Sequence, residues 1–214
     1  VVSGSNKMLF SGFDLVSFAT VAITLVVAIS VHEFSHAAAA DWLGDPTPRH
    51  QGRLTLDPRR HLDPLGSIML VIAGFGWGRP VYTNPHYFRG DARTGMAMVA
   101  AAGPISNLVL AIFAAFPVRL GMITDRTIAS NVVVFISINV LLLVFNLIPV
   151  APLDGFKVAV GFLPDEWAHI MIRLEQYGPM ILMMLILSGR LGFNLLGMLM
   201  GPAHGAIVKI LLGF

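Results

Sequence analysis

The stretch LVSFATVAITLVVAISVHEFSHAAAADWL, residues Leu15 to Leu43, decides the fold of this chain. It is apolar over most of its length, and as one helix it would extend about 43 Å, more than the roughly 30 Å of a membrane's hydrocarbon core. The stretch therefore predicts a transmembrane helix whose far end, with Asp41 and Trp42, emerges at a membrane interface.

Three ionisable side chains interrupt this apolar run: His32, Glu33 and His36. Histidines four residues apart project from one face of a helix, where two imidazoles can share a zinc ion and the glutamate between them can face a water on the metal. The same short pattern also occurs in soluble helices that hold no metal. In lipid, ionisable groups are costly and find no water, so here the pattern favours a metal-dependent hydrolase.

The composition places the whole chain in a membrane. Of its 214 residues, 56% are hydrophobic and only 12% are charged, whereas soluble domains carry about 25% charged residues. We expect one integral membrane domain covering residues 1–214, embedded in a lipid bilayer. The absence of cysteine excludes thiolate ligands, so a zinc site must use His, Asp or Glu. No basic stripe is present, and we expect no nucleic-acid partner.

Further apolar stretches extend the prediction to an all-α polytopic membrane protein with about five to six transmembrane helices. The additional spans expected are Thr94–Val118, Ile128–Val150, Ala168–Ser188 and Leu191–Leu212.

The eleven apolar residues Leu65–Phe75 are too few to cross a core that needs about 20. Both flanking loops are rich in arginine, which favours the cytoplasmic side for each of them. A re-entrant segment is therefore the main interpretation, and a tilted full span is the alternative. Nearby, Arg53–Leu56 and Pro80–Thr83 alternate weakly and predict either a small membrane-surface β element or two loops.

Asp154 is the candidate third zinc ligand, because a catalytic zinc usually has three protein ligands. Pro149 and Pro152 disrupt the end of the preceding helix, and Gly155 permits a tight turn beside the carboxylate. The alternative is an interfacial aspartate that only begins a turn. If Leu65–Phe75 does not cross, Asp154 lies on the same side of the membrane as the two histidines.

Several of these segments together resemble the site-2 protease family of intramembrane zinc metalloproteases. The matching segments are His32–His36, Leu56–Gly66, Asn84–Phe88, Ala102–Asn107 and Asn146–Gly155. The resemblance implies the minimal type, without PDZ or CBS domains, with a catalytic core at about residues 15–157 and accessory helices at about 168–212.

The same resemblance implies an activity and its site. One Zn²⁺ per chain would be bound by His32, His36 and Asp154, and Glu33 would be the catalytic base in cleaving single-span membrane-protein substrates within or near their transmembrane segment. We expect the prokaryotic cytoplasmic membrane as the location, with the active site near the cytoplasmic side.

Asn107 and Asn146 are further candidates, either for binding the substrate backbone or oxyanion or for hydrogen bonds between helices. For Asn139 we favour a hydrogen bond between helices. Two other functions remain open from the residues alone: a transporter with an intramembrane ion path, and a catalytically idle relative that serves as a scaffold.

Overall fold

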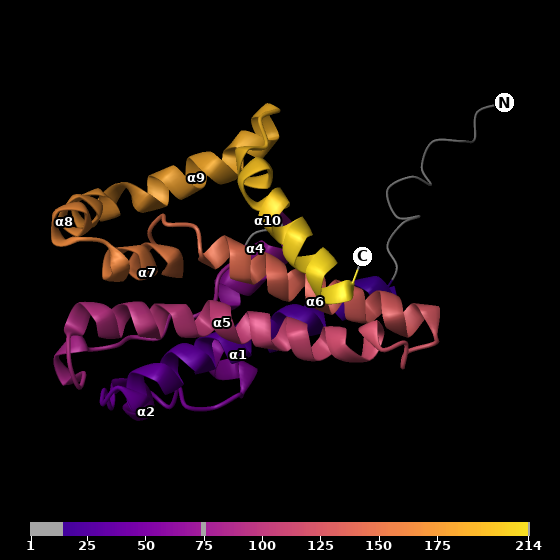
Figure 1. The fold of residues 1–214 in the computed structure, drawn as a ribbon, viewed down its shortest axis with the longest axis horizontal. Coiled ribbons are helices and arrows are strands. Elements are labelled where there is room, and N and C mark those ends of the chain that lie inside the picture. The colour runs from indigo at the N-terminus through magenta and orange to yellow at the C-terminus, as the bar shows by residue number, and fades with distance from the viewer. Residues whose placement is uncertain (1–14, 74–75, 214) are drawn as a thin grey trace.

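The computed structural model describes residues 15–73 and 76–213 (Figure 1). Within these ranges five helical stretches are long and apolar enough to cross a membrane, which confirms the prediction of an all-α polytopic protein. They are α1 (Leu15–Trp42), α5 (Ala92–Arg119), α6 (Arg126–Asn146), the continuous stretch Asp165–Ser188 and α10 (Leu195–Leu212).

The helices α1, α5 and α6 lie side by side and form the centre of the molecule (Figure 1). Small residues on α5 allow the close approach: Ala97, Ala100, Gly103, Ala111 and Ala115 are all buried. Asp91 and Asp125 cap the first turns of α5 and α6 by accepting backbone hydrogen bonds from Thr94 and Ile128.

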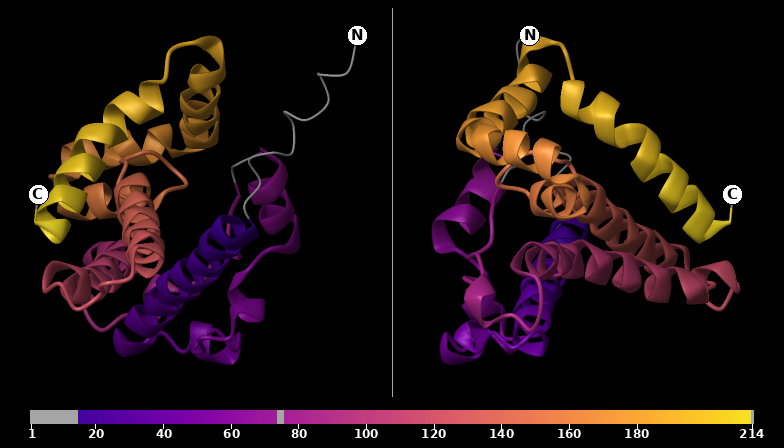
Figure 2. Two further views of the ribbon diagram at one scale, coloured as in Figure 1. Left: turned by 90° about the vertical axis from the view of Figure 1, so that its right-hand side faces the viewer. Right: turned by 60° about the vertical axis from the view of Figure 1, so that its left-hand side comes forward.

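The remaining helices are shorter or lie at the periphery of these three. Before α5 come α2 (Thr47–His50), α3 (Pro58–His61), α4 (Pro64–Ala73) and the single turn η1 (Pro85–Tyr87); after α6 come α7 (Asp154–Phe162), α8 (Asp165–Leu174), η2 (Glu175–Tyr177), α9 (Gly178–Ser188) and η3 (Gly189–Leu191). The views in Figure 2 place α4 and α10 on opposite sides of the three central helices.

The helix α4 is too short to cross a membrane. Its ten residues extend about 15 Å, half of the hydrocarbon core. Leu62 before α4 and Gly78 after it form an antiparallel bridge, and Arg79 N–H donates to the carbonyl of His61 at 2.7 Å. The chain therefore enters and leaves this hairpin at the same place, as a re-entrant segment requires. Gly74 and Phe75, the end of the predicted segment, lie outside the described residues.

The predicted membrane-surface β element is wrong for the part of the chain that the structure describes, where no strand forms. Neither Arg53–Leu56 nor Pro80–Thr83 pairs as a strand. The guanidinium of Arg53 instead donates to the backbone carbonyls of Arg60, Arg79 and Pro80. Of these three acceptors only Pro80 belongs to a predicted strand, so the side chain of Arg53 bonds mainly to the backbone next to the two segments.

The helix α7 is held against the beginning of α5. A Cβ atom on Gly161 would lie 2.2 Å from the Cβ of Ala97, so glycine is needed for this contact. The guanidinium of Arg93 donates to the carbonyls of Val160 and Leu163 at the end of α7 and pairs with Asp165 at 2.5 Å. Both contacts position the helix whose first residue is Asp154.

Candidate metal centre

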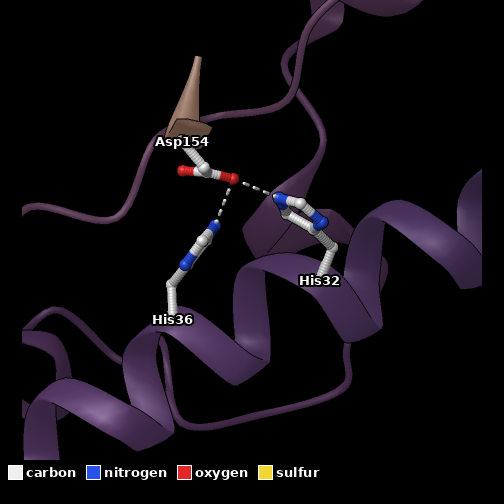
Figure 3. Close-up of side chains that lie close together, drawn as sticks. All are labelled: His32, His36 and Asp154. Atoms are coloured by element: carbon white, nitrogen blue, oxygen red, sulfur yellow. Dashed lines mark hydrogen bonds and ion pairs between the residues drawn. The ribbon is translucent and has the colours of Figure 1, made fainter. Parts of the chain in front are cut away.

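The two histidines lie one turn apart on α1, and their side chains leave the helix on the same face, toward Asp154 (Figure 3). Both are buried, with 7% and 8% of their surface exposed for His32 and His36. Their ring centroids are 4.6 Å apart. The four-residue spacing thus produces a pair of converging imidazoles, as the helical period requires.

Asp154, the first residue of α7, points toward the two histidines of α1. One carboxylate oxygen, Oδ2, lies 3.1 Å from Nε2 of His32 and 3.2 Å from Nε2 of His36 (Figure 3). The chain leaves α6 after Asn146, turns, and begins α7 at Asp154. Gly155 lies in α7, and a Cβ atom on it would lie 2.3 Å from the carbonyl oxygen of Leu147. Glycine therefore allows α7 to pack closely against the backbone that follows α6, whereas we expected it to permit a tight turn.

The opposite nitrogen of each ring is held by a hydrogen-bond acceptor. Nδ1 of His32 lies 2.7 Å from Oδ1 of Asn107, and Nδ1 of His36 lies 2.7 Å from the carbonyl oxygen of Val99. A carbonyl oxygen can only accept a hydrogen bond, so Nδ1 of each ring is the donor and carries the hydrogen. Nε2 of each ring faces Asp154, and in the neutral form of the ring this nitrogen has the lone pair that binds a metal ion.

Gly103 on α5 provides the space for both rings. A Cβ atom at this position would lie 2.4 Å from Nε2 of His36 and 2.6 Å from Nε2 of His32. Pro104 follows directly and is also buried. The Gly-Pro pair in the middle of α5 is therefore the place where the backbone of that helix passes next to the histidines.

These residues fit a zinc ion. With zinc–ligand distances of about 2.0–2.2 Å, tetrahedral ligand atoms are separated by about 3.4 Å, close to the two nitrogen–oxygen distances observed. All three ligand atoms lie within 4.8 Å of one another. In this arrangement the Asp154 carboxylate lies opposite both Nε2 atoms. Two nitrogen lone pairs and a carboxylate then converge, as a bound cation requires.

Glu33 and Asn146 face the same cavity as the three candidate ligands. The cavity has a volume of about 430 Å³, and its apolar walls come from α1, α5, α6, α9 and the segment that follows α4. Asn146 donates to the carbonyl of Leu142 in its own helix at 3.0 Å. Glu33 lies between the two histidines in sequence and next to them in the cavity lining, so it has access to any molecule that enters.

Asn107, for which substrate contact and hydrogen bonds between helices were both open, makes hydrogen bonds to neighbouring helices. It is fully buried, and its amide nitrogen donates to the carbonyl of Ala28 at 3.2 Å and to Oδ1 of Asn139 at 3.1 Å, while its oxygen faces His32. Asn139 makes the hydrogen bond between helices that we favoured for it. The orienting contact of Asn107 and the packing of Gly103 were not predicted from the sequence, although both residues lie in the segment Ala102–Asn107.

Comparison with curated proteins finds bacterial relatives whose names share the same words. YwhC of Bacillus subtilis is 37% identical over 88% of this chain and 89% of its own length. Rip2 of Mycobacterium tuberculosis is 34% identical and Rip2 of Mycolicibacterium smegmatis 30% identical, each over 76% of this chain and 64% of the relative. All three carry the name "putative zinc metalloprotease".

Two other comparisons give no match. No family model matches the chain. No solved structure matches it either. The identity to YwhC over nearly the whole length of both chains, together with the motifs described above, shows that this chain belongs to the site-2 protease family of zinc metalloproteases.

Proposed function

We propose that His32, His36 and Asp154 hold the zinc ion of this protease and that Glu33 is its catalytic base. The observation that carries the proposal is that Nε2 of His32, Nε2 of His36 and a carboxylate oxygen of Asp154 converge. His36 and Asp154 are 118 residues apart in the sequence. The hydrogen bonds on the two Nδ1 atoms support it, because they orient both rings for coordination.

The residues have separate tasks in hydrolysis of a peptide bond. His32, His36 and Asp154 would hold the zinc ion, and its chemistry would be that of a Lewis acid, which would lower the pKa of a water toward about 7 and polarise the scissile carbonyl. Glu33 takes a proton from the attacking water and returns it to the leaving amine, so that one water is added across the bond. Asn146 lines the same cavity and donates a hydrogen bond to the substrate backbone.

The substrates that we propose are single-span membrane proteins cut within or near their transmembrane segment. The apolar cavity walls and the surrounding membrane-spanning helices support this class. We place the catalytic core at about residues 15–157 and the accessory helices at about 168–212. Leu182 of α9 lies in the cavity lining, so the accessory part contributes to the substrate site.

We further propose that the site opens toward the cytoplasmic side of a prokaryotic cytoplasmic membrane. The chain from the end of α1 to the first turn of α5 carries the arginines that support this orientation, namely Arg49, Arg53, Arg59, Arg60, Arg79, Arg89 and Arg93.

Replacing Glu33 with Gln tests the function. The Glu33→Gln variant keeps the size of the side chain and removes its basic oxygen, so cleavage of single-span substrates should fall about 10²- to 10⁴-fold. Zinc content, measured on the purified protein, should stay at one ion per chain because Glu33 is not a ligand.

Each outcome of that comparison is decisive. Unchanged cleavage by Glu33→Gln would remove Glu33 from the mechanism. Loss of zinc from the same variant would show that Glu33 is a ligand and that the proposed set is wrong.

A further inference from the structure

Arg53 is a buried charged residue outside the metal centre, in the connection between α2 and α3. Only 4% of its surface is exposed. Its guanidinium donates hydrogen bonds to three backbone carbonyls, those of Arg60, Arg79 and Pro80. Fixing this long side chain costs rotamer entropy, and burying its charge costs more, so the three bonds must compensate for both.

The three carbonyls lie on both sides of the α4 hairpin. Arg60 precedes the hairpin, and Arg79 and Pro80 follow it. One side chain therefore ties the entry of the hairpin to its exit, next to the bridge between Leu62 and Gly78.

The chain that follows the hairpin is one wall of the catalytic cavity. We call residues Gly76–Thr83 the wall segment; the members that line the cavity are Gly76, Trp77, Gly78, Pro80, Val81 and Thr83. A Cβ atom on Gly78 would lie 3.4 Å from Oε1 of Glu33. The position of the wall segment thus determines the space that is left beside the proposed catalytic base.

The backbone next to Arg53 and Arg60 is held in place by His61. His61 is fully buried, and its Nε2–H donates to the carbonyl of Thr55 at 2.6 Å. Burial lowers the pKa of the Arg53 guanidinium, and attraction to Glu33 partly offsets this effect. Within the part of the chain that the structure describes, the hydrogen bonds of the Arg53 guanidinium all go to backbone carbonyls, which leaves the carboxylate of Glu33 free of them.

We propose that Arg53 is a positioning residue of the protease site, which holds the wall segment at the distance from Glu33 that a bound substrate needs. The inference rests on the proposed function. A lysine cannot replace the residue, because a single ammonium group lacks the planar fork that reaches carbonyls on two sides.

The test compares Arg53→Gln and Arg53→Lys with a matched control, Arg59→Gln. Arg59 lies in α3, is exposed, and pairs with Asp57 at 2.8 Å. All variants are made in the full chain with Trp42 and Trp167 replaced by Phe, so that Trp77 in the wall segment is the only tryptophan left. Zinc content, kcat, KM and tryptophan emission are measured, with a single-span membrane protein as substrate.

Both Arg53 variants should keep one zinc per chain and show a shifted emission of Trp77. Their kcat/KM should fall roughly hundredfold, since displacements of about 1 Å cost that much, and the loss should lie mainly in KM because Glu33 and the ligands stay in place. Arg59→Gln should match the parent in every measurement.

Several results would overturn the proposal: parental kcat/KM in Arg53→Gln, full recovery in Arg53→Lys, an unshifted emission, or loss of zinc. If the parent protein cleaves no substrate, the proposed function fails, and the emission of Trp77 still decides whether Arg53 holds the wall segment.

Discussion

His32 can offer Nε2 to a metal only while its proton stays on Nδ1, and Asn107 is the residue that keeps it there. The amide of Asn107 is fixed in turn by Ala28 and Asn139, so its oxygen faces the ring. His36 depends in the same way on the carbonyl of Val99. At the scale of single residues, the ligands are therefore oriented by groups that never touch the ion.

Truncating Asn107 should weaken zinc binding. In Asn107→Ala, Nδ1 of His32 loses its acceptor and the ring can turn or change tautomer, so zinc affinity should fall about 10- to 100-fold. The measurement is competition with a chelator of known affinity. Asn146→Ala is the control, because it shortens a half-buried asparagine that bonds to neither ring. Parental affinity in Asn107→Ala would contradict the role.

Adding one methyl group at Gly103 should have a similar effect for a steric reason. The new Cβ would lie within 2.6 Å of both Nε2 atoms, so Gly103→Ala must displace the rings and should lower zinc affinity by at least about tenfold. Gly205→Ala in α10 is the matched control, since a Cβ there meets nothing within 4 Å. Equal zinc content at limiting zinc in the two variants would count against the close approach.

At the scale of elements, the order of crossings brings Asp154 to the histidines. Because α4 returns to its starting point, α5 crosses back and α6 crosses once more, which leaves the beginning of α7 next to the exit of α1 from the membrane. The short length of Leu65–Phe75 and its arginine-rich flanks were enough to predict this order.

Labelling of single cysteines tests that topology. The natural chain has no cysteine, so Arg59→Cys and Arg79→Cys, on either side of α4, should react with a membrane-impermeant reagent from the same side. Met122→Cys, in the loop between α5 and α6, should react from the opposite side. Reaction of positions 59 and 79 from opposite sides would show that α4 crosses, and the proposed placement of Asp154 would fail.

Other local features could not be predicted from the sequence. The acceptor of His36 is a backbone carbonyl, and every residue has one, so no residue type marks it. Arg53 looks like any loop arginine until its three carbonyl partners are known. In the sequence, Gly103 precedes a proline within a predicted span, and small residues in a span indicate close helix contact. The pattern does not indicate that the histidines are its neighbours.

At the scale of the whole molecule, a zinc ion would join α1 to the beginning of α7 and so link the two ends of the three-helix core. Several parts of the chain position the two sides of this junction. Gly103 and Gly155 allow close packing, Arg93 bonds to the end of α7, and Asp91 caps α5. The family could be recognised from the motifs alone, but the contribution of α9 to the cavity through Leu182 appears only in the structure.

Removing the metal should therefore affect both activity and stability. A chelator should abolish cleavage, and added zinc should restore it. Binding to the folded state alone stabilises it by about 2.7 kcal/mol when free zinc is 100-fold above Kd, so the unfolding temperature should rise with zinc. The Glu33→Gln variant should show the same rise and Asp154→Ala should show none; a rise in Asp154→Ala would place the stabilising ion elsewhere.

The most direct measurement of the proposed zinc centre is the X-ray absorption spectrum at the zinc edge of the purified, zinc-loaded protein. We expect one zinc per chain with two imidazole nitrogens at about 2.0–2.1 Å and the remaining nearest ligands oxygen. One of those oxygens should be lost in Asp154→Ala. A spectrum with fewer than two imidazoles, or one that Asp154→Ala leaves unchanged, would contradict the proposed ligand set.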